Sequence, residues 1–391
     1  MQIPKKIIFP LTIVACLLLG ATSSPGFDGN DAKVRIMRTP NNGIQPQAVI
    51  DDRGVLHLVY FSGEPSAGDI FYVYLKRDSR DFSTPIRVNS QEGSAIASGA
   101  VRGPHLAVGK NGHVHVSWNG SNKAEPRGPE NSCPMLYARM NDAGTAFEPQ
   151  RNLMQVSGVL DGGGTVAADN AGNVYVAWHG VGQEKGEQHR RVWLARSTDE
   201  GKTFAPEVDV FKEETGACGC CGMRASVDRE GNLYLLYRTA TQMTERGMFL
   251  LVSEDKGRTF QGKRVDEWTL TSCPLSTTTI TAGERKLAAW ENNKQVYFAS
   301  LDAKLKQKIV PLAAPGETGK RKHPAIATNA RGETLLAWVE SEGMKKGGSL
   351  AWQLFDKNGN PAVEKGTAEG VPVWGLATAV ATANGGFIII Y

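Results

Sequence analysis

Several basic residues lie close to the starts of segments in which apolar and polar residues alternate. We expect these segments to be strands. Arg102, Arg224 and Arg321 each stand at such a start, and His105 and His323 follow two of them closely. A guanidinium is always charged and can bind a carboxylate through two parallel hydrogen bonds. We therefore predict that these five residues bind an acidic substrate. The alternative for the segment from Arg321 to His323 is an ordinary solvated loop.

Two carboxylates are candidates for acid–base chemistry. Asp161 precedes three consecutive glycines, and Glu291 directly follows Trp290. Cleavage of a glycosidic bond uses two carboxyl groups about 5–9.5 Å apart, one of them with a raised pKa. We predict that Asp161 and Glu291 form such a catalytic pair. The alternative is that each is an ordinary carboxylate in a turn or in solvent.

Two further side chains suit ligand binding. His179 follows Trp178 where a loop is expected to begin, and Trp374 stands two residues after Pro372. The indole of Trp374 can stack on a sugar ring or plug a central channel, and His179 can contact a ligand or remain an ordinary surface histidine. We place both residues in the predicted substrate-binding set, and we expect no resident cofactor or metal.

The first 23 residues have the order of a secretion signal. Lys5 and Lys6 precede an apolar stretch from Ile7 to Leu19, and small residues follow it. We predict an exported protein, periplasmic or extracellular, with residues 1–23 as the signal and residues 24–391 as a single domain. Cys16 lies in a lipoprotein-like context, so a lipid on Cys16 is the alternative to simple cleavage.

Five cysteines remain beyond the signal, and three of them lie within four residues. They are Cys133, Cys218, Cys220, Cys221 and Cys273. Export permits disulfides, so we predict disulfides among the five, with one thiol left over. A thiolate site for copper or zinc, with His179 or His105 nearby, is an alternative, although the spacing matches no standard zinc pattern. A redox role is a third interpretation.

One sequence pattern recurs seven times along the chain and indicates how these residues are positioned. Each copy has an apolar alternation, a polar pair, a glycine and a second alternation that ends near an aromatic residue. The glycines, which are 58, 60, 59, 52, 49 and 53 residues apart, are Gly54, Gly112, Gly172, Gly231, Gly283, Gly332 and Gly385. Alternation with a period of two indicates strands, and the glycine suits a tight hairpin.

A third and a short fourth alternating run follow most hairpins, and no amphipathic helix of ten or more residues interrupts them. Four strands in each ~50–60 residues predict an all-β propeller of four-stranded blades. We count seven blades, with six as an alternative and two β-sandwiches as the runner-up architecture. The last copy ends at Tyr391 after two strands, and Lys33 to Arg38 is an outer strand without a blade. We predict that this N-terminal strand closes the last blade.

Composition excludes several classes of protein. The chain has 391 residues, of which 44 are glycine, and 21% are charged and 41% hydrophobic. This is neither a disordered chain nor a polytopic membrane protein. The formal net charge is only +4, without a long basic run, so we expect no nucleic-acid partner. We expect a monomer that contacts a membrane only through a lipid on Cys16.

A more specific motif follows the third alternating segment in two of the seven repeats. Residues 197–204 and 253–260 both read S-x-D-x-G-x-T-F, which is the Asp box. The chain therefore resembles the sialidase-like (BNR/Asp-box repeat) β-propeller superfamily, in particular bacterial proteins of the exo-α-sialidase type. The resemblance implies that the motif residues are structural: Ser197, Asp199, Gly201, Phe204, Ser253, Asp255, Gly257 and Phe260.

The same resemblance implies an activity and the place where it occurs. It favours a glycoside hydrolase, or a relative of one, that acts on a glycan or glycoconjugate carrying negative charge. The loops that lead into the first strand of each blade then line the site. Two alternatives remain open. One is a non-catalytic propeller that binds a glycan or a protein, and the other is an exported propeller that uses the Cys218–Cys221 cluster for metal or redox chemistry.

Overall fold

The computed structural model describes residues 33–391 except for eleven residues, which form nine gaps, and it does not describe the side chain of Asp161. The eleven residues are Ala100, Gln183, Met243, Thr271, Ser272, Glu284, Ala303, Thr318, Glu342, Met344 and Lys345. The predicted signal at residues 1–23 and Cys16 lie outside the described residues.

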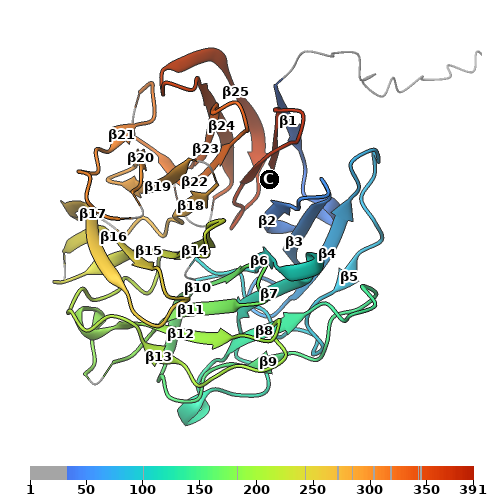
Figure 1. Ribbon diagram of the computed structural model, residues 1–391, viewed down its shortest axis with the longest axis vertical. Helices are drawn as coiled ribbons and strands as arrows, with labels where there is room; N and C mark the ends of the chain where they lie inside the picture. The colour runs from blue at the N-terminus through green and yellow to red at the C-terminus, as the bar shows by residue number, and fades with distance from the viewer. Residues whose placement is uncertain are drawn as a thin grey trace, which may run out of the picture. The chain divides into compact units, whose positions relative to one another are not determined.

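Residues 33–391 form seven sheets, which are the blades of a β-propeller (Figure 1). In the first six blades, four strands that follow one another in the chain pair antiparallel. This confirms the predicted all-β propeller with seven blades. The inner strands are β2 (Ile44–Ile50), β6 (His105–Val108), β10 (Leu160–Ala168), β14 (Arg224–Val227), β18 (Thr279–Ala282), β22 (Arg321–Thr328) and β26 (Thr378–Ala381).

The remaining strands complete the blades from the inside outward. The second strands are β3 (Leu56–Ser62), β7 (Val114–Asn119), β11 (Val174–Gly180), β15 (Leu233–Ala240), β19 (Lys286–Asn292), β23 (Thr334–Glu340) and β27 (Phe387–Ile390). The third strands of the first six blades are β4 (Asp69–Leu75), β8 (Met135–Arg139), β12 (Arg191–Ser197), β16 (Glu245–Ser253), β20 (Gln295–Ser300) and β24 (Gly348–Phe355). The outer strands are β5 (Ile86–Arg87), β9 (Arg151–Asn152), β13 (Val208–Asp209), β17 (Gln261–Thr269), β21 (Leu312–Ala313) and β25 (Pro361–Val371).

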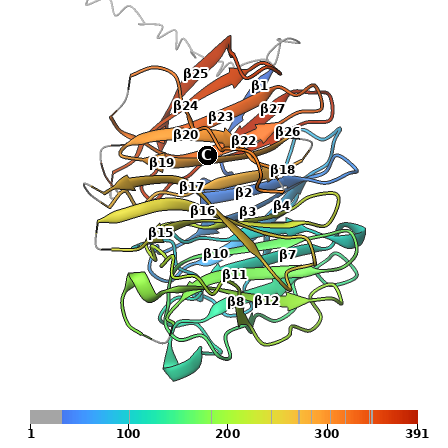
Figure 2. The ribbon, with the colours of Figure 1, turned by 60° about the vertical axis from the view of Figure 1, so that its left-hand side comes forward.

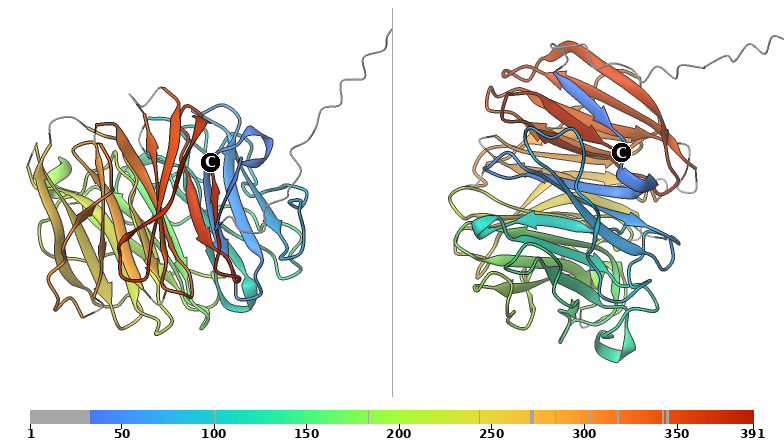
Figure 3. Two further views of the ribbon diagram at one scale, coloured as in Figure 1. Left: turned by 90° about the horizontal axis from the view of Figure 1, so that it is seen from above. Right: turned by 90° about the vertical axis from the view of Figure 1, so that its right-hand side faces the viewer.

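The two ends of the described chain meet in the seventh blade. Strand β1 (Val34–Met37) pairs in parallel with β27, so the described part of this sheet has the order β1-β27-β26. Figures 2 and 3 show the blue β1 among the red strands of this blade. The Tyr391 N–H donates to the Met37 carbonyl at 3.2 Å. The N-terminal strand therefore closes the last blade, as the sequence predicted, and this pairing links the first blade to the last.

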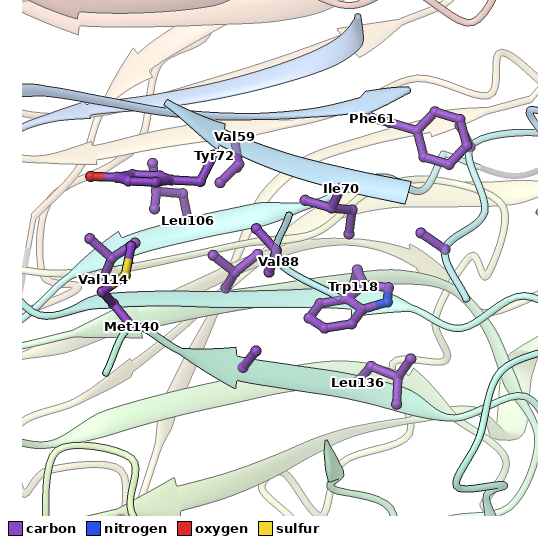
Figure 4. Close-up of a cluster of buried hydrophobic side chains, with 14 of the residues drawn as sticks. Val59, Phe61, Ile70, Tyr72, Val88, Leu106, Val114, Trp118, Leu136 and Met140 are labelled. Carbon is purple, nitrogen blue, oxygen red and sulfur yellow. The ribbon is translucent and has the colours of Figure 1, made fainter. Parts of the chain in front are cut away.

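The core is divided among the seven contacts between neighbouring blades. Each contact holds its own cluster of buried apolar side chains. Along β3, Val59 and Phe61 face the second blade, whereas Leu58 and Tyr60 face the seventh. Figure 4 shows the cluster between the first two blades. Successive residues of a strand point to opposite faces, and in a propeller both faces are covered, so the second strands are buried almost throughout.

Tight turns replace helices as connections. Six of the seven predicted hairpin glycines have a positive φ, such as 79° at Gly54, and Gly283 is the exception. Among the described residues, the helical segments are four short 3₁₀ turns: η1 (Pro40–Asn42), η2 (Lys110–Gly112), η3 (Pro129–Asn131) and η4 (Glu187–His189). None of the helices in the described part of the chain has the length and apolarity needed to cross a bilayer.

Because the strands of the first six blades are antiparallel, their links alternate between the two ends of the propeller. We call one end the mouth. It carries the loops that lead into the inner strands and the links from second to third strands. The other end, the turn end, carries the inner hairpins and the S-x-D-x-G-x-T-F turns, which link β12 to β13 and β16 to β17.

The S-x-D-x-G-x-T-F turns at the turn end are held by local hydrogen bonds. The Ser197 hydroxyl donates to Asp199 Oδ1 at 2.7 Å and accepts from the Gly201 N–H at 2.9 Å. Asp199 accepts from the backbone N–H of Thr203 at 2.9 Å and from its hydroxyl at 2.6 Å. Burial by itself raises the pKa of Asp199, but these hydrogen bonds outweigh it and lower the pKa to about 2. The turn from Ser253 to Phe260 repeats the same bonds around Asp255.

Candidate functional site

The mouth is closed by loops that bond to one another across blades. Gln45 leads into the first blade, and its Nε2 donates to the Ala97 carbonyl at 2.9 Å and to the Trp374 carbonyl at 3.1 Å. The Val101 N–H donates to the Cys220 carbonyl at 3.0 Å. Two small cavities of about 30 and 10 Å³ remain between the loops. These volumes have room for one or two waters but not for a sugar ring.

The backbone of the mouth is strained at non-glycine residues. Gln45, Leu275, His323 and Trp374 lie in the left-handed region, with φ between 43° and 61°. Gln45 and His323 lie near the starts of β2 and β22, and Leu275 and Trp374 lie in the loops that lead into β18 and β26. A non-glycine residue in this conformation costs of the order of 1 kcal/mol or more and persists only where the surroundings hold it. Glu200 and Lys256 adopt the same conformation at the turn end, inside the two S-x-D-x-G-x-T-F turns. At the mouth, contacts between residues far apart in the sequence hold the strained residues.

Below the mouth, a channel of about 440 Å³ is lined by all seven inner strands. Its lining is mostly small or apolar: alanine, valine, isoleucine, leucine and threonine. Among the described residues that line it, Arg224 is the only charged one. Arg224 stands at the first position of β14, where the channel meets the mouth. The channel therefore ends on a single guanidinium.

Arg224 is held by neutral partners. Its Nη1 donates to Gln47 Oε1 at 2.7 Å and to His105 Nδ1 at 2.9 Å. Burial lowers the pKa of Arg224 to about 10, so the group is still charged at neutral pH. Burial, together with the charge of Arg224, keeps the pKa of His105 well below its usual value, so this imidazole is neutral and can accept the bond. The geometry leaves the guanidinium charge uncompensated by the described residues that contact it.

The predicted substrate-binding residues separate into three groups. Arg102, His105 and Arg224 line the cavity of about 10 Å³. His323 and Trp374 line the cavity of about 30 Å³, and burial lowers the pKa of His323 to about 3. Gln45, Val101 and Leu376 line both cavities and so join the two groups. These five predicted residues therefore do gather at one end of the channel.

The third group, Arg321 and His179, lines neither cavity. Arg321 donates to the Ala314 carbonyl of the neighbouring blade at 2.9 Å and lies 4.7 Å from the centre of the Trp338 ring of its own blade. His179 is fully buried, with its ring against Tyr237. Burial lowers the pKa of His179 to about 4, and neither ring nitrogen has a hydrogen-bond partner.

The predicted catalytic carboxylates are not brought together by any described contact. Glu291 is buried at the end of β19, where its Oε2 accepts from Arg238 Nη2 at 2.9 Å and its Oε1 accepts from the Lys294 N–H at 2.6 Å. Both oxygens are thus engaged by the protein itself. The backbone of Asp161 lies in β10, but its side chain lies outside the described atoms, so the pair stays a prediction.

Four of the five cysteines form one cluster beside the mouth. Cys220 Sγ lies 3.3 Å from Cys218 Sγ and 2.9 Å from Cys273 Sγ. Cys221 belongs to the same group, because the thiols of Cys218, Cys220 and Cys221 lie within 4.8 Å of one another. All five cysteines are free thiols, so the structure does not contain the predicted disulfides. Cys133 stands apart and bonds Asn122 at 3.1 Å.

Gln47 and Arg238 are two important residues that were not in the predicted set. Gln47 holds Arg224, and no sequence pattern distinguishes it from other polar residues near a strand start. Arg238 does carry a signal, because it is a charged residue that directly follows the apolar run from Leu233 to Tyr237. It is buried, pairs with Glu291 and lies over the Trp268 ring at 5.0 Å.

Fold and site together define a seven-bladed β-propeller whose channel ends on one guanidinium. The chain matches no protein family model and no curated protein. Among solved structures, a protein of unknown function from Dyadobacter fermentans is similar with a TM-score of 0.54 and 13% identity, over 79% of this chain and 93% of that chain. This similarity supports the fold.

Two further solved structures have lower TM-scores. The Hadza microbial sialidase Hz136 has a TM-score of 0.48 and 14% identity, over 81% of this chain and 70% of its own. An α-L-arabinanase from Penicillium chrysogenum, complexed with arabinobiose, has a TM-score of 0.49 and 13% identity, over 82% of this chain and 95% of its own.

Proposed function

We propose that this protein binds the acidic group of an anionic glycan against Arg224, at the end of the channel that meets the mouth. The observation that carries the proposal is the charge at that position. Arg224 is the only charged side chain among the described residues of the channel lining, and its described hydrogen-bond partners are neutral. A guanidinium in such surroundings is matched best by a carboxylate or sulfate.

The surroundings of Arg224 favour recognition of a ligand group over mere structural support. Gln47 and the neutral His105 fix the guanidinium without cancelling its charge. Trp374 lines the neighbouring cavity and offers an aromatic surface of the kind on which sugars stack. The two cavities lined by Arg224 and Trp374 are too small for a sugar, so the ligand reaches Arg224 through the channel or after the mouth loops separate.

The described geometry supports binding of an anionic glycan. We propose hydrolysis of that glycan as a second step. Glycosidic cleavage requires the second carboxyl group, which we assign to Asp161, and requires Glu291 to leave its ion pair with Arg238. We propose further that the chain is exported, on the grounds of the sequence of residues 1–23, and that it acts as a monomer. An acidic glycan outside the cytoplasm is consistent with that placement.

The test measures binding of paired oligosaccharides of equal length, one acidic and one neutral, by titration calorimetry. We expect selective binding of the acidic member. Arg224→Gln removes one charge-assisted interaction and is expected to weaken binding about 10- to 100-fold. Arg285→Gln is the matched control, because Arg285 bonds the Gly332 carbonyl at 2.9 Å at the turn end. Equal binding of both oligosaccharides, or normal binding by Arg224→Gln, would refute the proposal.

A product-release assay on the same acidic glycans separates an enzyme from a binder. If the chain is a hydrolase, wild-type protein releases product and Asp161→Asn abolishes release while binding persists. Release that Asp161→Asn leaves unchanged would contradict the assigned carboxylate. Selective binding without release would identify a non-catalytic propeller.

A further inference from the structure

We propose that Cys218, Cys220, Cys221 and Cys273 form a site for a soft metal ion, monovalent copper in the first place. This site is separate from the Arg224 site and does not depend on the proposed glycan function. The cysteines come from two neighbouring blades: the first three lie in the loop that leads into β14, and Cys273 lies in the loop that leads into β18.

The distances between the sulfurs suit one shared ion. Two thiolates bound to one ion at about 2.3 Å lie at most about 4.6 Å apart. The structure places Cys220 Sγ 3.3 Å from Cys218 Sγ and 2.9 Å from Cys273 Sγ. The three sulfurs of Cys218, Cys220 and Cys221 all lie within 4.8 Å of one another. Shifts of about an ångström or less therefore suffice to arrange them around a metal ion.

The loops fix this arrangement through their backbones. The Cys218 N–H donates to the Arg238 carbonyl at 2.9 Å, and the Cys221 N–H donates to the Cys218 carbonyl at 3.3 Å. The next residue, Gly222, donates its N–H to the Ser276 carbonyl at 3.2 Å, which ties this loop to the one that carries Cys273. The thiols are thus held together by the fold and not by chance contacts of exposed side chains.

A metal ion can engage all four thiols at one centre, whereas each disulfide joins only two of them. Cys220 contacts both Cys218 and Cys273, so a single disulfide at Cys220 would leave two thiols crowded against it. Cys218 and Cys221 are each only 1% exposed, and beside them His179 has two buried ring nitrogens without partners. Cys273 is exposed, which provides a path for an ion to enter.

The ligands are soft thiolates, which bind copper(I), and zinc is the competing ion. Cys218 and Cys221 have the C-x₂-C spacing of structural zinc sites, but Cys220 between them adds a third thiol within the same four residues. Arg238 lies near enough to Cys218 and Cys221 for their charges to interact and can balance the negative charge of bound thiolates. Each thiol that becomes a ligand releases one proton to solvent, and copper stays in the +1 state, so no electron is transferred.

The test titrates reduced protein, without oxygen, with monovalent copper in competition with bicinchoninate. We expect one tight site and the ultraviolet charge-transfer absorption of a copper–thiolate bond. Cys218→Ser combined with Cys221→Ser should lower the affinity at least 100-fold. Cys133→Ser is the matched control and should bind like wild type, because Cys133 lies outside the cluster.

Two further measurements keep the proposal open to refutation. The single variant Cys273→Ser changes an exposed position, so it should fold, and we expect at least a tenfold loss of affinity. A thermal melt of each apo-variant reports on folding. The proposal is overturned if reduced wild-type protein does not compete with bicinchoninate, or if Cys133→Ser weakens binding as much as the cluster variants. Bound Zn²⁺ that Cu⁺ does not displace would overturn the assignment to copper.

Discussion

The two ends of this propeller are built by different interactions. At the turn end, Asp199 and Asp255 bond groups within four residues of themselves. At the mouth, Gln45 bonds carbonyls 52 and 329 residues away in the sequence. The turn end therefore holds its conformation through local sequence. The mouth holds strained residues and buried charges, and these persist only because distant loops are brought against them.

The mouth itself contains two contrasting arginines in the fourth blade. Arg238 on β15 is 2% exposed and pairs with the buried carboxylate of Glu291. Arg224 on β14 faces the channel and bonds neutral groups. The first arginine is therefore part of the support of the mouth, whereas the second presents its charge to a ligand. Substitutions of these residues separate structural support from ligand binding.

The largest effect is expected from breaking the buried pair. Arg238→Gln leaves Glu291 buried without its cation, which typically costs about 3–5 kcal/mol. Arg224→Gln removes a charge that has no anionic partner among the described contacts, so we expect a change in stability below about 1 kcal/mol. Urea unfolding of both variants measures the difference. Equal losses of stability would show that Arg224 is also a structural residue.

A pH-dependent effect of intermediate size is expected at the mouth. His323 Nδ1 accepts from the Thr277 N–H at 3.2 Å, and burial lowers the pKa of His323 from 6.5 to about 3. Below pH 6.5 the unfolded chain therefore binds a proton that the folded chain does not, so stability falls as the pH falls. The shift corresponds to a loss of about 2 kcal/mol between pH 7 and pH 5.

The matched variant for this prediction is His323→Asn. Asparagine tolerates the positive φ at this position and can accept the same backbone N–H, but it does not titrate. Urea unfolding at pH 7 and pH 5 should show a drop in stability about 2 kcal/mol smaller in the variant than in wild type. Identical drops in the two proteins would contradict the prediction.

The smallest effect is expected at the turn end. Asp255→Ala removes the carboxylate that organises one turn, and a partly exposed network of this kind contributes about 1–2 kcal/mol. Because the turn end is far along the strands from the mouth, the variant should retain anion binding and copper binding. Thermal melts and both titrations check this. Loss of either binding activity would show that the two ends are coupled.

The fold could be predicted from the sequence because its signals are local. The blade count followed from the seven hairpin glycines and the alternating segments. The closure of the last blade followed from the N-terminal strand at Lys33 to Arg38, which has no blade of its own. The sequence also predicted that five of the binding residues lie at one end, because the links into the inner strands of all blades lie at the same end of a propeller. These residues are Arg102, His105, Arg224, His323 and Trp374.

What the sequence did not reveal depends on contacts between distant residues. Arg321 begins its inner strand as Arg224 does, but counted from the hairpin it is Ala325 that takes the position of Arg224. The Arg321 guanidinium instead donates to the Ala314 carbonyl and lies over the Trp338 ring. Glu291 was predicted to be free for catalysis, yet Arg238 and the Lys294 N–H engage both of its oxygens. The direction in which a long side chain turns depends on neighbours that alternation alone does not specify.

The sequence by itself determined the propeller, its seven repeats and the turn end, since period-two alternation and turn residues act over a few residues. The tertiary structure alone decided that the mouth is closed, that one guanidinium ends the channel, and that four thiols meet. Those features arise where loops separated by 50 to 330 residues are packed together, and there burial and hydrogen-bond partners, rather than residue type, determine what a side chain can do.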